Sequence, residues 1–198
     1  MTAEGGVAAG SVVVLEPAVQ RLDQQLVTGV PPQRLDVAMG QALPMNIDAR
    51  LRELGIELPA PMGPGGNYVP AAIAGDLLFL SGMAPVRPDG SLLTGKVGPG
   101  GLDVETAREG ARLTGLQLLA VLQAELGDLG RVQNVVKLFG MVNCRPGFNQ
   151  TPAVIDGCSD LLVDVFGDRG RGARSAVGMA ELPFDIAVEI EAVVRLEA

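Results

Sequence analysis

Residues 171–196, RGARSAVGMAELPFDIAVEIEAVVRL, contain the strongest signals for fold and function in this chain of 198 residues. β-Branched and small residues alternate along two arms of the stretch, a pattern typical of strands. The segment Leu182-Pro183-Phe184-Asp185 separates the arms and has the composition of a turn. The pattern therefore predicts two strands joined as a hairpin.

A single arginine, Arg174, lies within the first arm among small residues, and Glu189 and Glu191 follow on the second arm. A guanidinium keeps its proton, so one withdrawn from water requires an anion. A guanidinium, a nearby carboxylate and a floor of small residues suit a small carboxylate-bearing molecule. The alternative is an ion pair between Arg174 and Glu189 or Glu191 across the hairpin, because most charges near a sheet are paired or solvated.

The other segments alternate strand and helix signals. The expected elements are a helix at 47–54, strands at 68–74 and 77–81 around a Gly75-Asp76 turn, a short strand near 92–97, a helix from Asp103 to Gly127, a strand at 131–143 and a helix at 152–166. Residues 131–143 are almost continuously apolar, which predicts burial on both faces of a sheet. This order predicts an α+β fold with two helices packed on one face of a mixed sheet. The other face then needs partner copies to cover it.

The composition excludes several kinds of chemistry. The chain has no histidine, which excludes a Ser-His-Asp triad, histidine-ligated zinc and the paired histidines of common ribonucleases. It carries 15 basic and 23 acidic residues, a net charge of −8, with one tyrosine and no tryptophan. An acidic chain with so few aromatic residues lacks the basic, stacking surface of a typical nucleic-acid binder. We therefore expect no nucleic-acid partner.

The two cysteines, Cys144 and Cys158, do not have the spacing of metal ligands. We expect both to be buried as small hydrophobic residues, which fits a reducing, cytoplasmic setting. The sequence contains no run of about 20 apolar residues, so we expect no membrane span. The N-terminus also lacks the pattern of a secretory signal.

Residues 1–44 are rich in Gly, Ala, Val, Gln and Pro without sustained periodicity. We expect them to form a poorly ordered N-terminal extension that carries no chemistry. Residues 45–198 are expected to form the single folded domain, which is long enough for a substantial core.

Several motifs, in the right order, resemble the RidA/YjgF family of reactive enamine/imine deaminases, and in particular its longer YjgF-like branch, whose members are often labelled endoribonucleases. The matching segments are 174–183, 188–193, Asn67-Tyr68-Val69-Pro70, Leu80-Ser81-Gly82, the strand at 135–142, the amphipathic segment at 45–56 and the segment at 154–161. The resemblance implies a chorismate-mutase-like fold and a homotrimer with sites at the subunit interfaces. It also implies hydrolysis of small enamine or imine acids to keto acids and ammonia, without a cofactor or metal.

Site residues also follow from the resemblance. Arg174 corresponds to the clamp on the substrate carboxylate, and Glu189 to the acid nearest the attacking water. Tyr68 corresponds to a residue that lines the pocket, and Ser81 and Gly82 to its floor. Whether Glu189 or Glu191 serves the site is left open by the sequence, since period-2 geometry places both on one strand face.

The chain departs from the family pattern around the clamp. Ala176 replaces a common cysteine, Gly172 a common histidine and Met83 a common glutamine. Asp156 stands where an asparagine is expected, near the predicted substrate pocket; it either raises the pKa of a neighbouring carboxyl or caps a turn. These departures support a second hypothesis, a non-catalytic or differently specialised trimer that binds a small carboxylate metabolite. An endoribonuclease is the less favoured third hypothesis.

Overall fold

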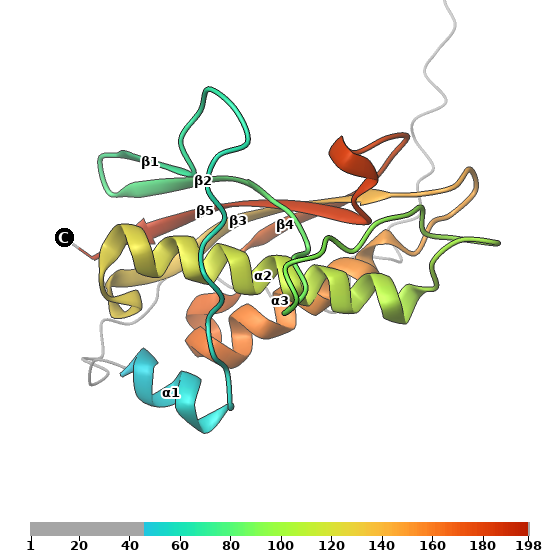
Figure 1. Ribbon diagram of the computed structural model, residues 1–198. Helices are drawn as coiled ribbons and strands as arrows, with labels where there is room; N and C mark the ends of the chain where they lie inside the picture. The colour runs from blue at the N-terminus through green and yellow to red at the C-terminus, as the bar shows by residue number, and fades with distance from the viewer. Residues whose placement is uncertain (1–45, 198) are drawn as a thin grey trace, which may run out of the picture. The chain divides into compact units, whose positions relative to one another are not determined.

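The computed structural model describes residues 46–197, so the extension predicted for residues 1–44 lies outside the described residues. Within residues 46–197 a five-stranded sheet has the order β1-β2-β5-β3-β4 and carries its helices on one face (Figure 1). The strands are β1 (Ala71–Ala74), β2 (Leu77–Met83), β3 (Val132–Asn143), β4 (Ala173–Met179) and β5 (Val188–Leu196). The helices are α1 (Ile47–Glu53), α2 (Val104–Leu126) and α3 (Thr151–Phe166), with short 3-10 turns η1 (Leu129–Arg131), η2 (Gly167–Gly170) and η3 (Pro183–Asp185). This is the predicted mixed α+β architecture.

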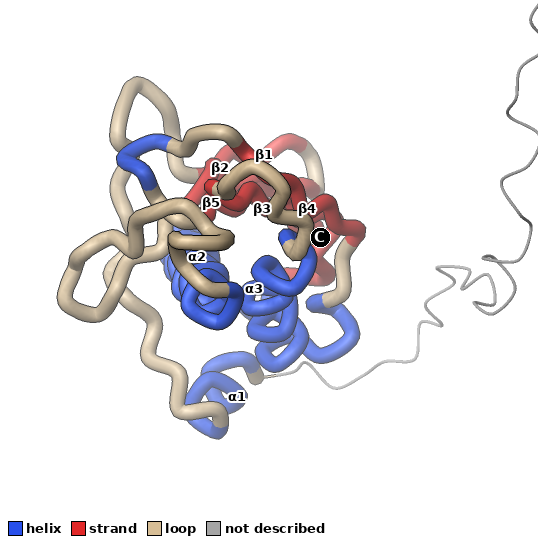
Figure 2. The backbone as a smooth tube through the Cα atoms, turned by 90° about the vertical axis from the view of Figure 1, so that its right-hand side faces the viewer, coloured by secondary structure: helices blue, strands red, loops and turns tan. Residues whose placement is uncertain are grey.

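The two long helices, α2 and α3, lie side by side under the sheet, and Figure 2 shows the two layers end-on. Burial alternates along β5, where Ile190, Ala192 and Val194 are buried and the residues between them are more exposed. The buried side chains therefore face the helices, and within residues 46–197 the helices leave the opposite face of the sheet open. No helix within residues 46–197 is long and apolar enough to cross a membrane.

Local sequence signals fix the ends of several elements. The Asp103 side chain accepts a hydrogen bond from the Thr106 amide and caps α2, while Gly127 ends that helix with a φ of 73°. Gly75 and Asp76 form the two-residue connection between β1 and β2, with Ala74 opposite Leu77. These features confirm the predicted helix ends and the predicted first hairpin.

The predicted hairpin within residues 171–196 is wrong, because β4 and β5 do not pair. Strand β3 lies between them, parallel to β4 and antiparallel to β5. Two backbone hydrogen bonds hold the connection between β4 and β5 near the C-terminal end of β3. The Asn143 amide donates to the Ala187 carbonyl, and the Gly95 amide donates to the Asp185 carbonyl. In this arrangement the long apolar strand β3 has a hydrogen-bonded strand on each side. A hairpin between β4 and β5 would not place β3 between them.

Two further predictions need correction. Residues 92–97 form isolated bridges, among them Val86 with Leu92, and not a continuous strand. Strand β3 is buried on its helix face alone: Leu138 and Val142 are buried, whereas Phe139 and Met141 on the open face are half-buried. The apolar run along β3 thus exceeds what the helices cover.

Candidate functional site

Arg174 lies near the start of the edge strand β4, and its side chain points towards α3. It is in register with Leu138, which is in register with Ala192, and both are buried under the helices. Its Nη1 donates to Asp156 Oδ1 at 2.7 Å and to Ser159 Oγ at 2.9 Å. The predicted alternative of a pair with Glu189 or Glu191 across a hairpin is therefore wrong, because the carboxylate that Arg174 meets comes from α3. We call Arg174, Asp156 and Ser159 the Arg174 cluster.

The Arg174 cluster borders a hollow of about 290 Å³ between α3 and the edge of the sheet. Its lining residues are Val135, Leu138, Asp156, Ser159, Asp160, Leu162, Val163, Gly170, Arg171, Gly172 and Arg174. A Cβ at Gly172 would stand 2.9 Å from the Val135 carbonyl oxygen, which is too close for any side chain without a shift. The glycine at this position thus lets the loop before β4 pack against β3 and form one wall of the hollow.

Glu189 lies on the opposite face of the sheet from Arg174. It is in register with Met141 on the open face, and a Cβ at Gly82 would collide with its Oε1. The absent side chain of Gly82 therefore makes room for the Glu189 carboxyl. Burial, and then the nearby charge of Glu191, raise the pKa of Glu189 above its usual value.

The remaining predicted residues, Ser81 and Tyr68, precede Gly82 in the chain, Ser81 directly. Ser81 Oγ donates to the Val69 carbonyl at 2.7 Å, and the Tyr68 hydroxyl accepts from the Gly65 amide at 3.0 Å. Tyr68 remains half exposed, at 51%. We call Glu189, Gly82 and Ser81 the Glu189 cluster, with Tyr68 on the segment that leads to it. A single chain thus holds Arg174 with Asp156 on one face of the sheet and Glu189 with Gly82 on the other.

Residue Ser159 was not foreseen as part of the site. It follows Asp156 by three residues on α3, so both project from one side of the helix. The sequence signal for Ser159 is therefore its spacing from Asp156 on the predicted helix.

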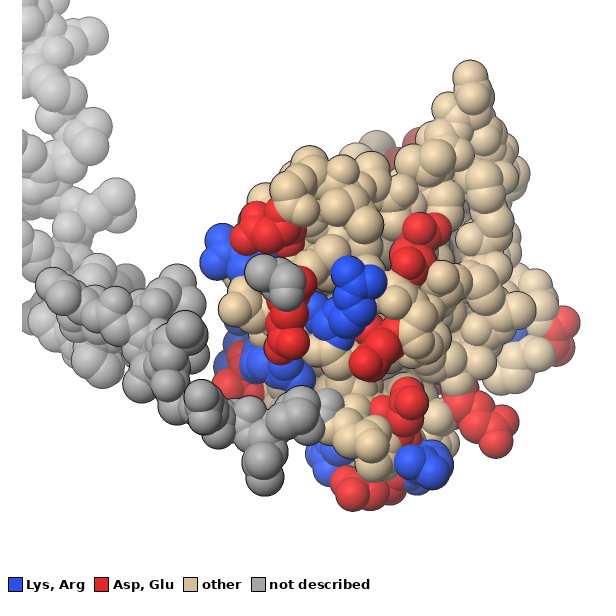
Figure 3. All heavy atoms as spheres, turned by 90° about the vertical axis from the view of Figure 1, so that its left-hand side faces the viewer, with Lys and Arg blue, Asp and Glu red and all other residues tan. Residues whose placement is uncertain are grey.

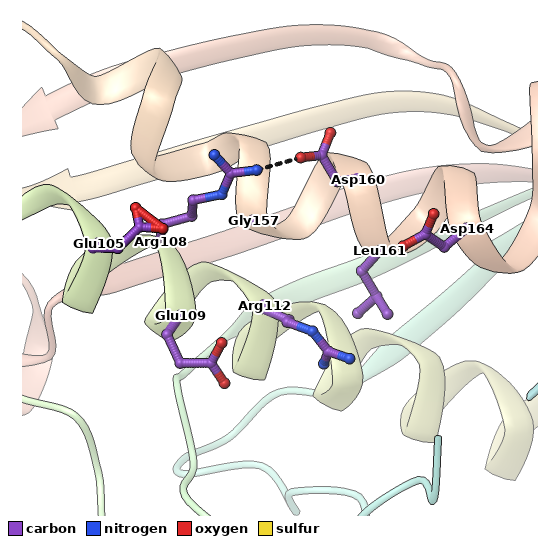
Figure 4. A pocket seen from close by; sticks show the side chains of 8 residues that line it. All are labelled: Glu105, Arg108, Glu109, Arg112, Gly157, Asp160, Leu161 and Asp164. Atoms are coloured by element: carbon purple, nitrogen blue, oxygen red, sulfur yellow. Dashed lines mark hydrogen bonds and ion pairs between the residues drawn. The ribbon is translucent and has the colours of Figure 1, made fainter. Parts of the chain in front are cut away.

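A second hollow, of about 450 Å³, lies on the outer side between α2 and α3 (Figure 4). It is lined by Glu105, Arg108, Glu109, Arg112, Gly157, Asp160, Leu161 and Asp164. Arg108 Nη2 contacts Asp160 Oδ2 at 2.6 Å and so joins the two helices. The lining offers exposed charges but neither a hydroxyl nor a thiol, and a solvated helix surface accounts for it.

The two cysteines differ in exposure. Cys158 is completely buried, and desolvation raises the pKa of its thiol to about 12. It is therefore protonated at neutral pH, which argues against a nucleophile. Cys144 is only partly buried, so the expected burial is confirmed for Cys158 alone.

Charges of both signs are interspersed on the face that Figure 3 shows. Ion pairs join Arg195 to Asp76 at 3.1 Å and Arg169 to Glu197 at 3.7 Å. The mixed charges on the face in Figure 3 are unlike the continuous basic surface that holds a nucleic-acid backbone.

A protein-family model described as "YjgF/chorismate mutase-like, putative endoribonuclease" matches residues 48–190. The chain belongs to the YjgF/RidA family. The match covers β1 to β4 and the first three residues of β5, together with α2 and α3. Membership explains the mixed sheet with helices on one face, and it confirms the family that the sequence motifs resembled.

Individual relatives of this YjgF/RidA chain extend the comparison. Protein TCP17 of Trypanosoma cruzi is 45% identical over 152 residues, which cover 76% of this chain and 94% of that protein. The crystal structure of protein Atu1372 from Agrobacterium tumefaciens is 41% identical with a TM-score of 0.70, over 78% of this chain and 94% of the other. A Dermatophagoides farinae protein named 2-iminobutanoate/2-iminopropanoate deaminase is 29% identical over 140 residues, 70% of this chain and 91% of that protein.

Proposed function

We propose that this protein hydrolyses small enamine or imine acids to 2-keto acids and ammonia. Family membership and the relative named as an imine deaminase support the reaction class. The observation that carries the proposal is which nitrogen atoms of the Arg174 guanidinium are already hydrogen-bonded. Among residues 46–197 its side-chain hydrogen bonds both use Nη1, so Nε and Nη2 remain as a two-donor edge beside the hollow. Such an edge matches the two oxygens of a carboxylate.

In the proposed reaction Arg174 holds the substrate carboxylate and Glu189 handles protons. Glu189 takes a proton from water as the water oxygen bonds to the imine carbon, and passes it to the nitrogen. In the second half the proton of the new hydroxyl follows the same route, the carbon–nitrogen bond breaks, and ammonia leaves. Glu189 is ionised again at the end of the reaction. Its raised pKa lies nearer to neutral pH than the usual value, so that Glu189 can act both as a base and as an acid. No cofactor is required.

Assembly is part of this proposal, because the two clusters occupy opposite faces of one sheet. We propose a homotrimer in which the Arg174 cluster of one chain meets the Glu189 cluster of the next. The open face supports such contacts: Phe79, in register with Val193 on that face, is 44% exposed, and apolar side chains on an uncovered sheet face favour association.

The test uses purified full-length protein and freshly generated 2-aminoacrylate, with the decay of the imine followed by semicarbazone formation. The wild type is expected to accelerate decay, and Arg174→Ala to reduce kcat/KM by about 10²-fold, as expected when one partner of a charge pair is removed. Arg112→Ala is the matched control, because Arg112 lines the outer hollow and not the Arg174 hollow, and it should retain wild-type activity. If neither the wild type nor Arg174→Ala alters the decay, the deaminase proposal is wrong.

A second candidate function is the binding of a small carboxylate metabolite without turnover. The contact between Arg174 and Asp156 favours it, because part of the clamp already faces a protein carboxylate. This function predicts measurable binding of pyruvate by the wild type, loss of that binding in Arg174→Ala, and unchanged decay of 2-aminoacrylate. RNA cleavage, which the family description mentions, gains no support from an acidic chain of net charge −8.

A further inference from the structure

The Arg174 cluster contains an anion as well as a cation. Asp156 Oδ1 lies 2.7 Å from Arg174 Nη1, and the Asp156 side chain remains 43% exposed. Both residues line the hollow of about 290 Å³. The Asp156 contact with Arg174 uses Oδ1, so Oδ2 is available to a molecule that enters the hollow. An asparagine, the residue expected here, would supply a similar shape without the charge.

This second charge changes which ligands the clamp prefers. A guanidinium alone attracts any monocarboxylate, whereas the guanidinium and carboxylate of this pair sum to zero charge. A carboxylate on the free edge of Arg174 is therefore partly repelled by Asp156. A ligand that bears a cationic nitrogen beside its carboxylate avoids this cost, because its nitrogen can donate to Asp156 while its carboxylate binds Arg174.

The other charged residues of the hollow already have partners. Asp160 pairs with Arg108 at 2.6 Å, and Arg171 with Asp168 at 3.4 Å. Ser159, which shares Nη1 with Asp156, is uncharged. Among the residues that line the hollow, Asp156 is thus the one that can distinguish ligands by the charge next to their carboxylate.

We propose that Asp156 is a specificity residue that selects ligands with a cationic nitrogen next to the carboxylate: the iminium form of a 2-imino acid, and 2-amino acid zwitterions, in preference to 2-keto acids. The inference rests on the proposed function for the placement of the substrate carboxylate at Arg174. Water attacks an iminium carbon more readily than a neutral imine, so the same contact favours the reactive form of the substrate. The keto acid product lacks the cationic nitrogen and is released.

The test compares two probes with the same carbon skeleton, L-alanine and pyruvate, by isothermal titration calorimetry on the full-length protein. The wild type is expected to bind L-alanine more tightly. Asp156→Asn keeps the shape of the side chain and should weaken L-alanine binding and strengthen pyruvate binding by about 10-fold each, the size of effect expected when one charge contact is gained or lost. Ser159→Ala is the matched control: it removes the uncharged partner of the same nitrogen and should change both affinities by the same factor.

Several outcomes would overturn the inference. These are equal affinity of the wild type for the two probes, no binding of either probe, or the same change for both in Asp156→Asn. Thermal unfolding of each variant checks that it folds. If Asp156→Asn does not fold, the preference of the wild type for L-alanine over pyruvate decides whether the inference holds. Imine decay is measured separately. A correct probe preference without accelerated decay would refute the deaminase function and leave the role of Asp156 intact.

Discussion

Glu189 combines partial burial with a neighbouring carboxylate of the same charge. Desolvation disfavours its ionised form most, and the negative charge of Glu191 adds to this effect, so both raise the pKa of Glu189. The pKa of Glu189 is higher in the folded than in the unfolded protein. Between these two pKa values the folded protein therefore holds more protons than the unfolded protein. The contribution of Glu189 to stability is therefore present at low pH and is lost as pH rises through its folded pKa.

Replacement of Glu191 tests whether Glu189 acts as the base. Glu191→Gln removes the charge that adds to the burial effect, so the pKa of Glu189 should fall while remaining above its usual value. A base must be ionised to work, so the acidic limb of the kcat/KM profile should move to lower pH. The measurement is the pH dependence of 2-aminoacrylate decay, with Glu197→Gln at the end of the chain as the control. An acidic limb that stays in place in Glu191→Gln would show that another group controls the rate.

Individual site residues were predictable where chemistry singles out a side chain, but their contacts were not. Arg174 stood out because a cation among small strand residues requires an anion. Its actual partner, Asp156, lies 18 residues earlier on a helix, and only the packing of α3 against the edge of the sheet brings the two together. The opposite faces of Arg174 and Glu189 were likewise hidden, because they depend on which strands pair.

At the scale of elements, two glycines set the distance between α2 and α3. A Cβ at Gly157 would collide with the backbone carbonyl of Arg108, and one at Gly115 would stand 2.9 Å from Leu161 Cδ2. The helices therefore meet at a contact that only a residue without a side chain permits. This contact also fixes the position of Asp156, the residue before Gly157 on α3.

We expect Gly157→Ala to destabilise the protein by about 1–3 kcal/mol, because overpacking against a backbone carbonyl forces the helices apart. Gly110→Ala is the matched control within α2, since its Cβ would make ordinary contacts at 3.6–3.7 Å. It should gain up to about 1 kcal/mol from higher helix propensity. Urea unfolding gives both values. An equal gain in the two variants would mean that α2 and α3 separate without cost at Gly157.

Element boundaries were predictable where the signal is local. Asp103 and Gly127 mark the ends of α2 because capping depends on residues within one turn of the helix. The connection between β4 and β5 carries turn residues too, but a turn does not specify that its strands pair. The insertion of β3 between them is a long-range choice, driven by the need of an apolar strand for two neighbours.

At the scale of the whole molecule, the placement of the two clusters leads to a test of assembly. In the proposed trimer each site takes Arg174 from one chain and Glu189 from the next. Arg174→Ala and Glu189→Gln homotrimers should each retain no more than about one hundredth of wild-type activity. Mixed trimers, however, should contain sites in which the Arg174 of a Glu189→Gln chain faces the Glu189 of an Arg174→Ala chain. Random mixing of equal amounts makes about one quarter of the sites complete.

We therefore expect the two variants, unfolded together and refolded, to recover about one quarter of wild-type activity on 2-aminoacrylate, as follows from this cyclic arrangement. The same treatment of each variant alone should recover no more than about one hundredth, which controls for the refolding. Native mass spectrometry of variants with different tags would establish that mixed trimers form. If mixed trimers form without this gain in activity, Arg174 and Glu189 do not act together across an interface. Since one chain holds the two residues on opposite faces of its sheet, the proposed mechanism would then fail as well.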